Sequence, residues 1–337
     1  MNRTGHRKIL VTGASGFIGG TLTRRLAGGG AHVRAVVRGT SSTVGLTMPG
    51  VEIVVAEVSI AESMRGVARG CDLVINVAGT VSGSAELQRS VNVDGARNVT
   101  EAAIAAGVSR LVHVSSAGIY GFRTPGDVDE RTPVDPGPLP YGATKAEGEA
   151  IVRKVAAAGG LDVSIIRPAL VYGPGSAVWT TGLFKWAKRR PTIFLGDGSG
   201  FAPMVHVDDV VDLIAVLAEH DLAAGEVFNC AADPVVTWRE VLSGYAALAG
   251  HFSWLGLPVG PVRGIARVVS RLAPDGTPAA EISSLVGFLT GRRRFRVDKA
   301  AELLGWRPRV RLDEGIASCA PFLREQGLLT TEVRRTA

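Results

Sequence analysis

The sequence predicts an α/β fold built on a doubly wound, largely parallel sheet. Over the first 170 residues or so, short runs rich in Val and Ile alternate with segments of helical spacing that glycines separate. Alternation of this kind places parallel strands in one sheet with helices on both faces. The 337 residues are 46% hydrophobic and only 20% charged, a composition that excludes disorder and suffices for a large core.

The expected elements follow one another in a regular order. Six segments have the Val- and Ile-rich composition of buried parallel strands. They are residues 8–11, 32–37, 52–55, 72–77, 110–115 and 162–167. Helical spacing is found between them at residues 16–27, 85–106 and 141–158.

After Pro168 the strand–helix rhythm breaks. Gly173-Pro174-Gly175 is one of several interruptions between short helices, and no continuous linker separates a second domain. A smaller C-terminal lobe is therefore expected to be interleaved with the last strands of the sheet. The predicted units are a sheet domain at residues 1–172, completed by residues 205–230, and a lobe at residues 173–204 and 231–330.

Composition and charge exclude several classes of protein. The net charge is +6, but no basic stripe is interleaved with aromatic residues, so nucleic-acid binding is not expected. The first eight residues are polar, and the longest uncharged run, residues 241–262, contains glycine and proline, so neither a signal peptide nor a transmembrane helix is expected. The 3 cysteines lie far apart with no histidine at ligand spacing, which predicts a reduced, cytoplasmic protein without a structural metal.

The first strand leads directly into Thr12-Gly13-Ala14-Ser15-Gly16-Phe17-Ile18-Gly19. Glycines at this spacing let the backbone turn tightly and approach a diphosphate, and the following helix presents the N–H groups of its first turn. The motif stands where this function requires it, after a strand and at the start of an amphipathic helix. It predicts a dinucleotide site that includes Gly13, Ser15, Gly16, Phe17 and Ile18.

A second motif predicts proton transfer. Tyr141 and Lys145 are four residues apart on one expected helix, so their side chains share a face. A phenol with its ordinary pKa of about 10 exchanges protons poorly at neutral pH. An adjacent ammonium, helped by a positive nicotinamide ring, is expected to favour the phenolate and to lower the pKa of Tyr141.

Several motifs follow one another in the order typical of one enzyme family. They are Gly13-x-x-Gly16-x-x-Gly19, Asn92-Val93-Asp94-Gly95, Ser115-Ser116-Ala117-Gly118, Tyr141-Gly142-Ala143-Thr144-Lys145, Arg167-Pro168, Val205-His206-Val207-Asp208-Asp209-Val210 and Leu304-Gly305-Trp306-Arg307-Pro308. With them the chain resembles an extended short-chain dehydrogenase/reductase of the NAD-dependent epimerase/dehydratase superfamily, in particular its dihydroflavonol-reductase-like and 3β-hydroxysteroid-dehydrogenase-like members. The resemblance implies a Rossmann-type cofactor domain, a substrate-binding C-terminal lobe and a homodimer formed through helices 85–106 and 141–158.

The resemblance also implies individual roles. Tyr141 and Lys145 become catalytic residues that also contact the cofactor, and Ser116 holds the substrate oxygen beside Tyr141. Ser115 is the adjacent competitor, pointing to the opposite side of its strand. Asn92 is another implied cofactor contact, and it is expected either to position the active-site helix or a water, or to make a structural hydrogen bond at a helix kink. The other implied cofactor contacts are Glu57 and Val58 at the adenine, Ala78 and Gly79 beneath the cofactor, and Pro168 at the nicotinamide.

The choice of cofactor depends on the end of the second strand. An acid there would bind the ribose hydroxyls of NAD and repel a 2′-phosphate. Residues 33–42 contain no Asp or Glu, and Arg38 with nearby hydroxyls is suited to grip a 2′-phosphate. NADP(H) is therefore preferred over NAD(H). The alternative is that Arg38 stacks on the adenine or faces solvent.

Apolar residues replace polar ones at expected substrate positions. Val81, Leu170 and Ala202 stand where nucleotide-sugar enzymes of the family commonly carry polar or charged contacts. The prediction is an NADP(H)-dependent oxidoreductase that interconverts an alcohol and a ketone or aldehyde on a fairly apolar small molecule. One alternative is a nucleotide-sugar epimerase or dehydratase with tightly bound NAD, and a second is a non-catalytic, cofactor-sensing protein.

Two further patterns have alternative explanations. His206 with the adjacent acids Asp208 and Asp209 resembles a metal cluster, but acids at a strand-to-helix turn more often cap the helix, so no metal is expected. Residues 262–272 form an amphipathic helix whose arginines recur every four residues. This helix is expected to be a lid with a solvated arginine face, and the alternative is contact with a membrane surface.

Overall fold

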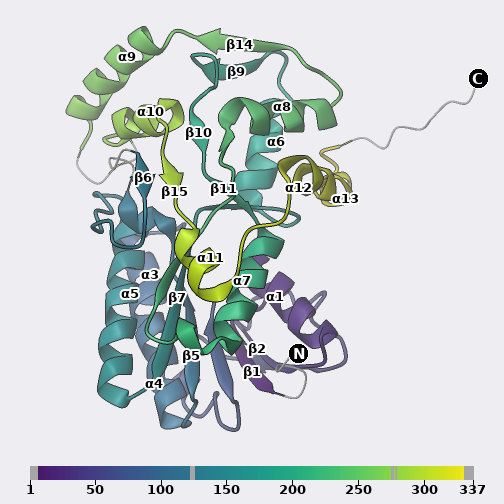
Figure 1. The fold of residues 1–337 in the computed structure, drawn as a ribbon, viewed down its shortest axis with the longest axis vertical. Helices are drawn as coiled ribbons and strands as arrows, with labels where there is room; N and C mark the ends of the chain where they lie inside the picture. The colour runs from purple at the N-terminus through teal and green to yellow at the C-terminus, as the bar shows by residue number, and fades with distance from the viewer. Residues whose placement is uncertain (1–6, 122–125, 275–276, 278, 330–337) are drawn as a thin grey trace, which may run out of the picture.

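The computed structural model describes residues 7–121, 126–274, 277 and 279–329, and it confirms the predicted doubly wound α/β fold (Figure 1). The predicted boundaries at residues 1 and 330 lie outside this range. One 7-stranded parallel sheet has the order β12-β7-β5-β4-β1-β2-β3. Its strands are β1 (Lys8–Thr12), β2 (His32–Val37), β3 (Val51–Val55), β4 (Leu73–Asn76), β5 (Arg110–Val114), β7 (Asp162–Pro168) and β12 (Val227–Cys230). The six strands expected before residue 170 are thus found within one residue of their expected bounds.

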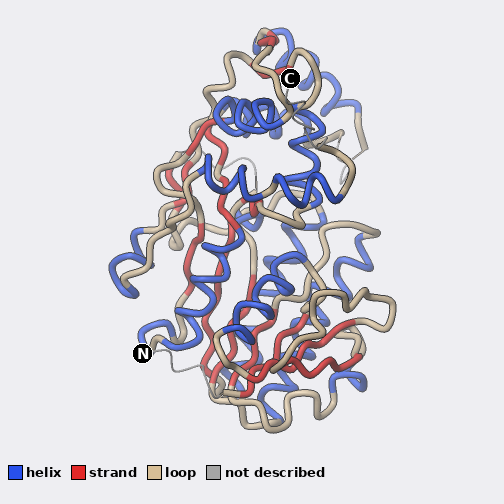
Figure 2. Tube along the Cα trace, turned by 90° about the vertical axis from the view of Figure 1, so that its right-hand side faces the viewer, coloured by secondary structure: helices blue, strands red, loops and turns tan. Residues whose placement is uncertain are grey.

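Helices cover both faces of this sheet (Figure 2). They are α1 (Phe17–Gly28), α2 (Ala61–Met64), α3 (Ala85–Arg89), α4 (Gly95–Ala105), α5 (Pro140–Gly159) and α7 (Val207–Glu219). Successive strand residues point to opposite faces, so Ile9 lies in the core beneath α1 and α7, and Leu10 lies in the core beneath α4 and α5. The sheet is therefore buried on both sides, as its continuous apolar runs require.

The predicted helix at residues 85–106 is helical throughout but is not a uniform α-helix. A π-helical turn at Ser90–Asp94 lies between α3 and α4. A Cβ at Gly148 of α5 would lie 2.2 Å from the carbonyl oxygen of Asn92, so α5 packs against this turn at a distance that only glycine permits. The wider turn thus brings Asn92 against the helix that carries Tyr141 and Lys145.

Most of the remaining elements form a lobe above the carboxyl ends of the strands (Figure 1). Its strands pair in twos: β8 (Leu170–Tyr172) with β11 (Met204–His206), β9 (Thr192–Leu195) with β14 (Trp254–Leu257), β10 (Phe201–Ala202) with β13 (Val236–Thr237), and β6 (Asp127–Val128) with β15 (Arg294–Phe295). Its helices are α6 (Leu183–Ala187), α8 (Trp238–Leu248), α9 (Val259–Leu272), α10 (Ile282–Thr290), α12 (Leu312–Ser318) and α13 (Ala320–Glu325), with a π-helical turn at Ala177–Gly182. α11 (Asp298–Leu304) instead packs on the sheet domain, where Lys299 donates to the Val227 carbonyl of β12 and Ala300 lies in the core (Figure 1).

The lobe has its own aromatic core. Phe184 and Tyr245 meet edge to face with ring centroids 6.4 Å apart, and Trp238 and Phe288 do so at 6.0 Å. Edge-to-face pairs of this kind add to the stabilisation that burial of the rings provides. Among the described residues, no helix is both long and apolar enough to cross a membrane.

Candidate active site

A cavity of about 690 Å³ lies at the carboxyl ends of the central strands. The sheet order reverses at β1, which has β2 on one side and β4 on the other, and in such folds ligands bind in the crevice at this reversal. Many of the predicted site residues line the cavity. They are Gly13, Ser15, Gly16, Phe17, Ile18, Arg38, Glu57, Val58, Ala78, Gly79, Val81, Tyr141 and Lys145.

The glycine-rich turn forms the floor of the cavity. Gly13 has φ +65°, and a Cβ on it would lie 2.9 Å from the Cα of Ala78. A Cβ on Gly19 would lie 2.1 Å from the carbonyl oxygen of Gly13, so α1 also approaches the turn too closely for any side chain. α1 begins after Gly16 with no acidic residue in its first turn. Its free N–H groups and the positive end of its dipole therefore fit a diphosphate.

Replacing Gly13 with Ala is expected to weaken binding of NADH and NADPH by at least about tenfold, because strain of 1–3 kcal/mol at a left-handed residue displaces the turn. Fluorescence titration of the reduced cofactors measures the change. Gly28→Ala is the matched control in α1, since nothing lies within 4 Å of a Cβ there. Equal cofactor affinities for the two variants would contradict the role of Gly13.

One end of the cavity is formed by the residues after β2 and β3. Arg38, Ser41 and Ser42 lie in its lining together with Glu57 and Val58. The Glu57 carboxylate accepts a hydrogen bond from the Ser59 hydroxyl at 3.3 Å. This end thus combines an exposed guanidinium and two hydroxyls with one carboxylate.

Tyr141 and Lys145 lie in the wall at the other end, on the first turns of α5. Burial raises the pKa of Tyr141, and a hydrogen bond with the Ser116 hydroxyl offsets part of this rise. Burial lowers the pKa of Lys145 to about 8, while Glu149 acts in the opposite direction. The Lys145 Nζ donates to the carbonyl oxygen of Val114 at 2.7 Å.

The expectation that Lys145, together with a nicotinamide ring, lowers the pKa of Tyr141 stays a prediction, because the protein alone supplies only the first of these two charges. The pKa of Tyr141 is raised, because desolvation of the phenol is the largest effect on it. The Lys145 ammonium is directed at the end of β5 instead of the phenol oxygen. Spacing on a helix places two side chains on one face, but it does not decide which neighbour the longer one bonds.

The two adjacent serines face different groups. Ser116 accepts a hydrogen bond from the Gly118 N–H at 3.0 Å, and a Cβ on Gly118 would lie 3.1 Å from the Ser116 Oγ and 3.3 Å from the Tyr141 Cε1. Ser115 lies in the cavity lining, and its side chain helps to lower the pKa of Glu149. The structure thus brings the Ser116 hydroxyl, and not that of Ser115, to Tyr141.

Asn92 lies behind the cavity wall and not in its lining. Its amide accepts from the Thr80 N–H at 2.9 Å, donates to the Thr80 carbonyl at 2.9 Å and donates to the Thr144 Oγ1 at 3.0 Å. Thr144 precedes Lys145 in α5. Asn92 therefore makes structural hydrogen bonds, which was one of the two expectations. Its bond to Thr144 also positions α5, which was part of the other.

Besides Asn92, three predicted site residues are not found in the cavity lining, namely Ser116, Pro168 and Leu170. Pro168 ends β7, and Leu170 packs against the aromatic core of the lobe, whereas Ala169 and Val171 line the cavity. The reason is strand alternation, which turns every second side chain to the same face. The lining also contains Leu87, Val178 and Trp179, which no sequence motif indicated.

A buried ion pair lies behind Lys145. The Arg167 guanidinium donates two hydrogen bonds to the Glu149 carboxylate, at 3.0 and 2.6 Å, and a third to the Tyr120 hydroxyl at 2.6 Å. Burial raises the pKa of Glu149, but Arg167, with smaller contributions from Ser115 and Arg153, makes the net shift downward. No sequence motif indicated this pair, although Tyr141, Lys145 and Glu149 share one spacing of four residues.

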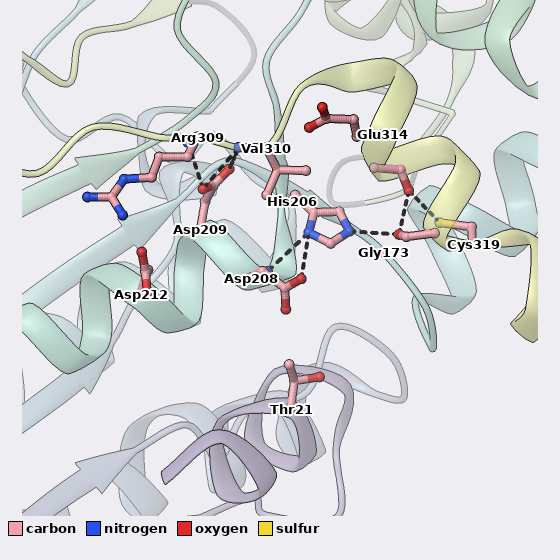
Figure 3. Close-up of polar contacts among 12 residues, drawn as sticks. Thr21, Gly173, His206, Asp208, Asp209, Asp212, Arg309, Val310, Glu314 and Cys319 are labelled. Atoms are coloured by element: carbon pink, nitrogen blue, oxygen red, sulfur yellow. Dashed lines mark hydrogen bonds and ion pairs between the residues drawn. The ribbon is translucent and has the colours of Figure 1, made fainter. Parts of the chain in front are cut away.

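The residues around His206 tie the C-terminal segment to α7 (Figure 3). The prediction that the acids cap this helix is wrong, because the His206 Nδ1 accepts from the Asp208 N–H at 3.3 Å and is itself the cap. Asp209 instead accepts from the Arg309 N–H at 2.8 Å and from the Val310 N–H at 3.2 Å. Within the part of the chain that the structure describes, no group of three or more His, Cys, Asp or Glu side chains could hold a metal ion.

Comparisons with known proteins agree with this geometry. The model of the NAD dependent epimerase/dehydratase family matches residues 9–231. The 3beta-hydroxysteroid-dehydrogenase/decarboxylase isoform 1 of Arabidopsis thaliana is 33% identical over 80% of this chain and 66% of its own length. The UDP-glucose 4-epimerase of Mycolicibacterium smegmatis is 32% identical over 95% of this chain and 99% of its own length.

One similar protein has been solved with its cofactor bound. DesIV, a dTDP-glucose 4,6-dehydratase of Streptomyces venezuelae solved with NAD and TYD bound, is 25% identical, covers 94% of this chain and 97% of its own, and superposes with a TM-score of 0.73. The glycine turn, the helix N-terminus and the Tyr141–Lys145 pair fit such a cofactor. The chain therefore belongs to the NAD dependent epimerase/dehydratase family of extended short-chain dehydrogenases/reductases and is an enzyme of the NAD-binding type.

Proposed function

We propose that the protein is an NADP(H)-dependent oxidoreductase that interconverts an alcohol and a ketone or aldehyde on a fairly apolar small molecule. The observation that carries this proposal is the group of large apolar side chains in the cavity lining. Val81, Leu87, Val178 and Trp179 belong to it, beside the polar residues Thr80 and Ser176. An apolar wall of this kind suits a substrate with few polar groups.

The chain's own residues have distinct roles in this reaction. Tyr141 gives a proton to the substrate oxygen during reduction and takes it back during oxidation. Ser116, hydrogen-bonded to Tyr141, holds that oxygen in place. Lys145 holds α5 against β5 through the Val114 carbonyl and supplies a positive charge to the buried end of the cavity. The bound nicotinamide supplies or accepts the hydride.

The preference for NADP(H) rests on the end of β2. Arg38, Ser41 and Ser42 are the groups available to a 2′-phosphate there, and residues 38–42 contain no acid. Charge-assisted hydrogen bonds to a phosphate contribute about 1.5–3 kcal/mol each. Arg38→Ala is therefore expected to weaken NADPH binding about 10- to 100-fold and to change NADH binding little, as measured by fluorescence titration. Equal losses for both cofactors would contradict the assignment.

A second candidate is a nucleotide-sugar epimerase, which the likeness to the mycobacterial UDP-glucose 4-epimerase favours. Such an enzyme returns the hydride to the same substrate and retains its NAD. The deciding experiment purifies the protein, measures whether NAD remains bound after dialysis, and follows NADPH oxidation with apolar ketones and epimerisation of UDP-glucose in parallel. Exchangeable NADPH with ketone reduction supports the proposal, whereas retained NAD with epimerisation overturns it.

A further inference from the structure

The outer edge of the lobe carries an exposed apolar and basic surface, which we call the α9 edge and define as residues 252–272. We propose that the α9 edge binds the interface of a bilayer that contains anionic lipid. This inference does not depend on the proposed reaction. It rests on which side chains of α9 and β14 the fold leaves uncovered, and on the sign of the charge beside them.

α9 is packed against the protein along only part of its apolar face. Ala266 is 3% exposed, and the Ser270 hydroxyl donates to the Ala279 carbonyl and accepts from the Ser283 N–H next to α10. Beside this contact lies a second apolar stripe with the spacing of a helix face. Ile265, Val268 and Leu272 form it, and they are 66%, 56% and 81% exposed.

The apolar surface continues along the chain before α9. Phe252 is 81% exposed, and Trp254 and Leu255 of β14 are each about half exposed, at 48% and 50%. Figure 1 shows β14 and α9 along the same outer end of the lobe, far from the central sheet. Large apolar side chains gathered on one exposed edge indicate an interaction surface. A partly exposed Trp is also typical of a membrane interface.

The opposite flank of α9 is basic. Arg263, Arg267 and Arg271 recur every four residues and therefore share one side of the helix. Residues 241–274 contain no Asp or Glu, and none of the three arginines forms an ion pair with a carboxylate among the described residues. The α9 edge itself, residues 252–272, thus carries three arginines and no acidic residue.

These two flanks match an interfacial helix more closely than a protein contact. A helix lying in the membrane plane places its apolar stripe at the acyl boundary and its arginines at the phosphates. A symmetric contact between two copies of the chain would place the same arginine rows near one another, because both copies present the same patch. Charge complementarity therefore favours an anionic lipid surface over a second copy.

The test is co-sedimentation of the full chain with vesicles of phosphatidylcholine, with or without phosphatidylglycerol. We expect binding to the phosphatidylglycerol vesicles that weakens with added salt. The variant R263Q/R267Q/R271Q is expected to lose about 100-fold in affinity at low ionic strength, since each arginine near such a surface contributes about 1 kcal/mol. The variant I265N/V268N/L272N is expected to lose binding altogether.

The control replaces exposed apolar residues of the sheet domain. V44N/I60N removes Val44 and Ile60, which are 90% and 55% exposed, and is expected to bind vesicles like the unchanged protein. Circular dichroism and urea denaturation show that each variant is folded. The proposal is overturned if phosphatidylglycerol does not increase sedimentation, or if I265N/V268N/L272N binds as well as V44N/I60N. It is also overturned if I265N/V268N/L272N converts a dimer to a monomer in analytical ultracentrifugation without lipid, because a second copy then covers this face.

Discussion

Tyr141→Phe is expected to lower kcat by about 100- to 10,000-fold, the usual contribution of a positioned general acid. The substitution removes only the hydroxyl that bonds Ser116, and the ring keeps its place against Gly118. Cofactor affinity should therefore change little. The measurement is NADPH oxidation with a carbonyl substrate, alongside fluorescence titration of the cofactor.

Two comparisons make this result specific. Tyr245→Phe removes a buried hydroxyl of the lobe core, which bonds the Trp179 carbonyl at 3.3 Å, and should leave kcat close to its original value. Ser116→Ala should reduce kcat far more than Ser115→Ala, since only Ser116 is bonded to Tyr141. Unchanged turnover in Tyr141→Phe would remove the catalytic role and leave a cofactor-binding protein without this chemistry.

Glu149→Gln is expected to lower the free energy of unfolding by about 3–5 kcal/mol, because it leaves the Arg167 guanidinium buried without its carboxylate. The side chains of Arg167 and Glu149 are only 5% and 6% exposed. The double variant E149M/R167M, which removes both charges, should be much closer in stability to the original protein. Urea denaturation at neutral pH measures the free energy of unfolding of the original protein and of both variants.

The same helix supplies the control. Glu147 pairs with Arg89 on the exposed side of α5, so Glu147→Gln should cost less than about 1 kcal/mol. The pH dependence follows from the pKa of Glu149, which is lowered in the fold from its ordinary value of 4.5. Its stabilising contribution is complete above that value and is lost as the pH falls through the lowered pKa. A loss as small as that of Glu147→Gln would show that the buried pair does not hold α5 in place.

The strands and the cofactor turn were predictable because their signals are local. A run of Val and Ile specifies a buried strand wherever it stands, and β1 to β5 and β7 lie within one residue of their expected bounds. The glycine motif likewise needs only its own strand and helix, and Gly13 has the positive φ that such a turn requires. The expected helix at residues 85–106 shows the limit, because its spacing gave no sign of the π-helical turn that packs against Gly148 of α5.

In the candidate site, too, the features with local sequence signals were predictable and those that depend on tertiary contacts were not. By itself the sequence determined the sheet, the diphosphate turn, the common face of Tyr141 and Lys145 and the absence of an acid near Arg38, since each depends on residues a few positions apart. Only the tertiary structure decided that Ser116 meets Tyr141, that Lys145 bonds Val114, that Ala169 and Val171 replace Pro168 and Leu170 in the lining, and that Glu149 pairs with Arg167. The physical reason is that burial and hydrogen bonding depend on neighbours from distant parts of the chain. The spacing of nearby residues does not reveal which distant residues these are.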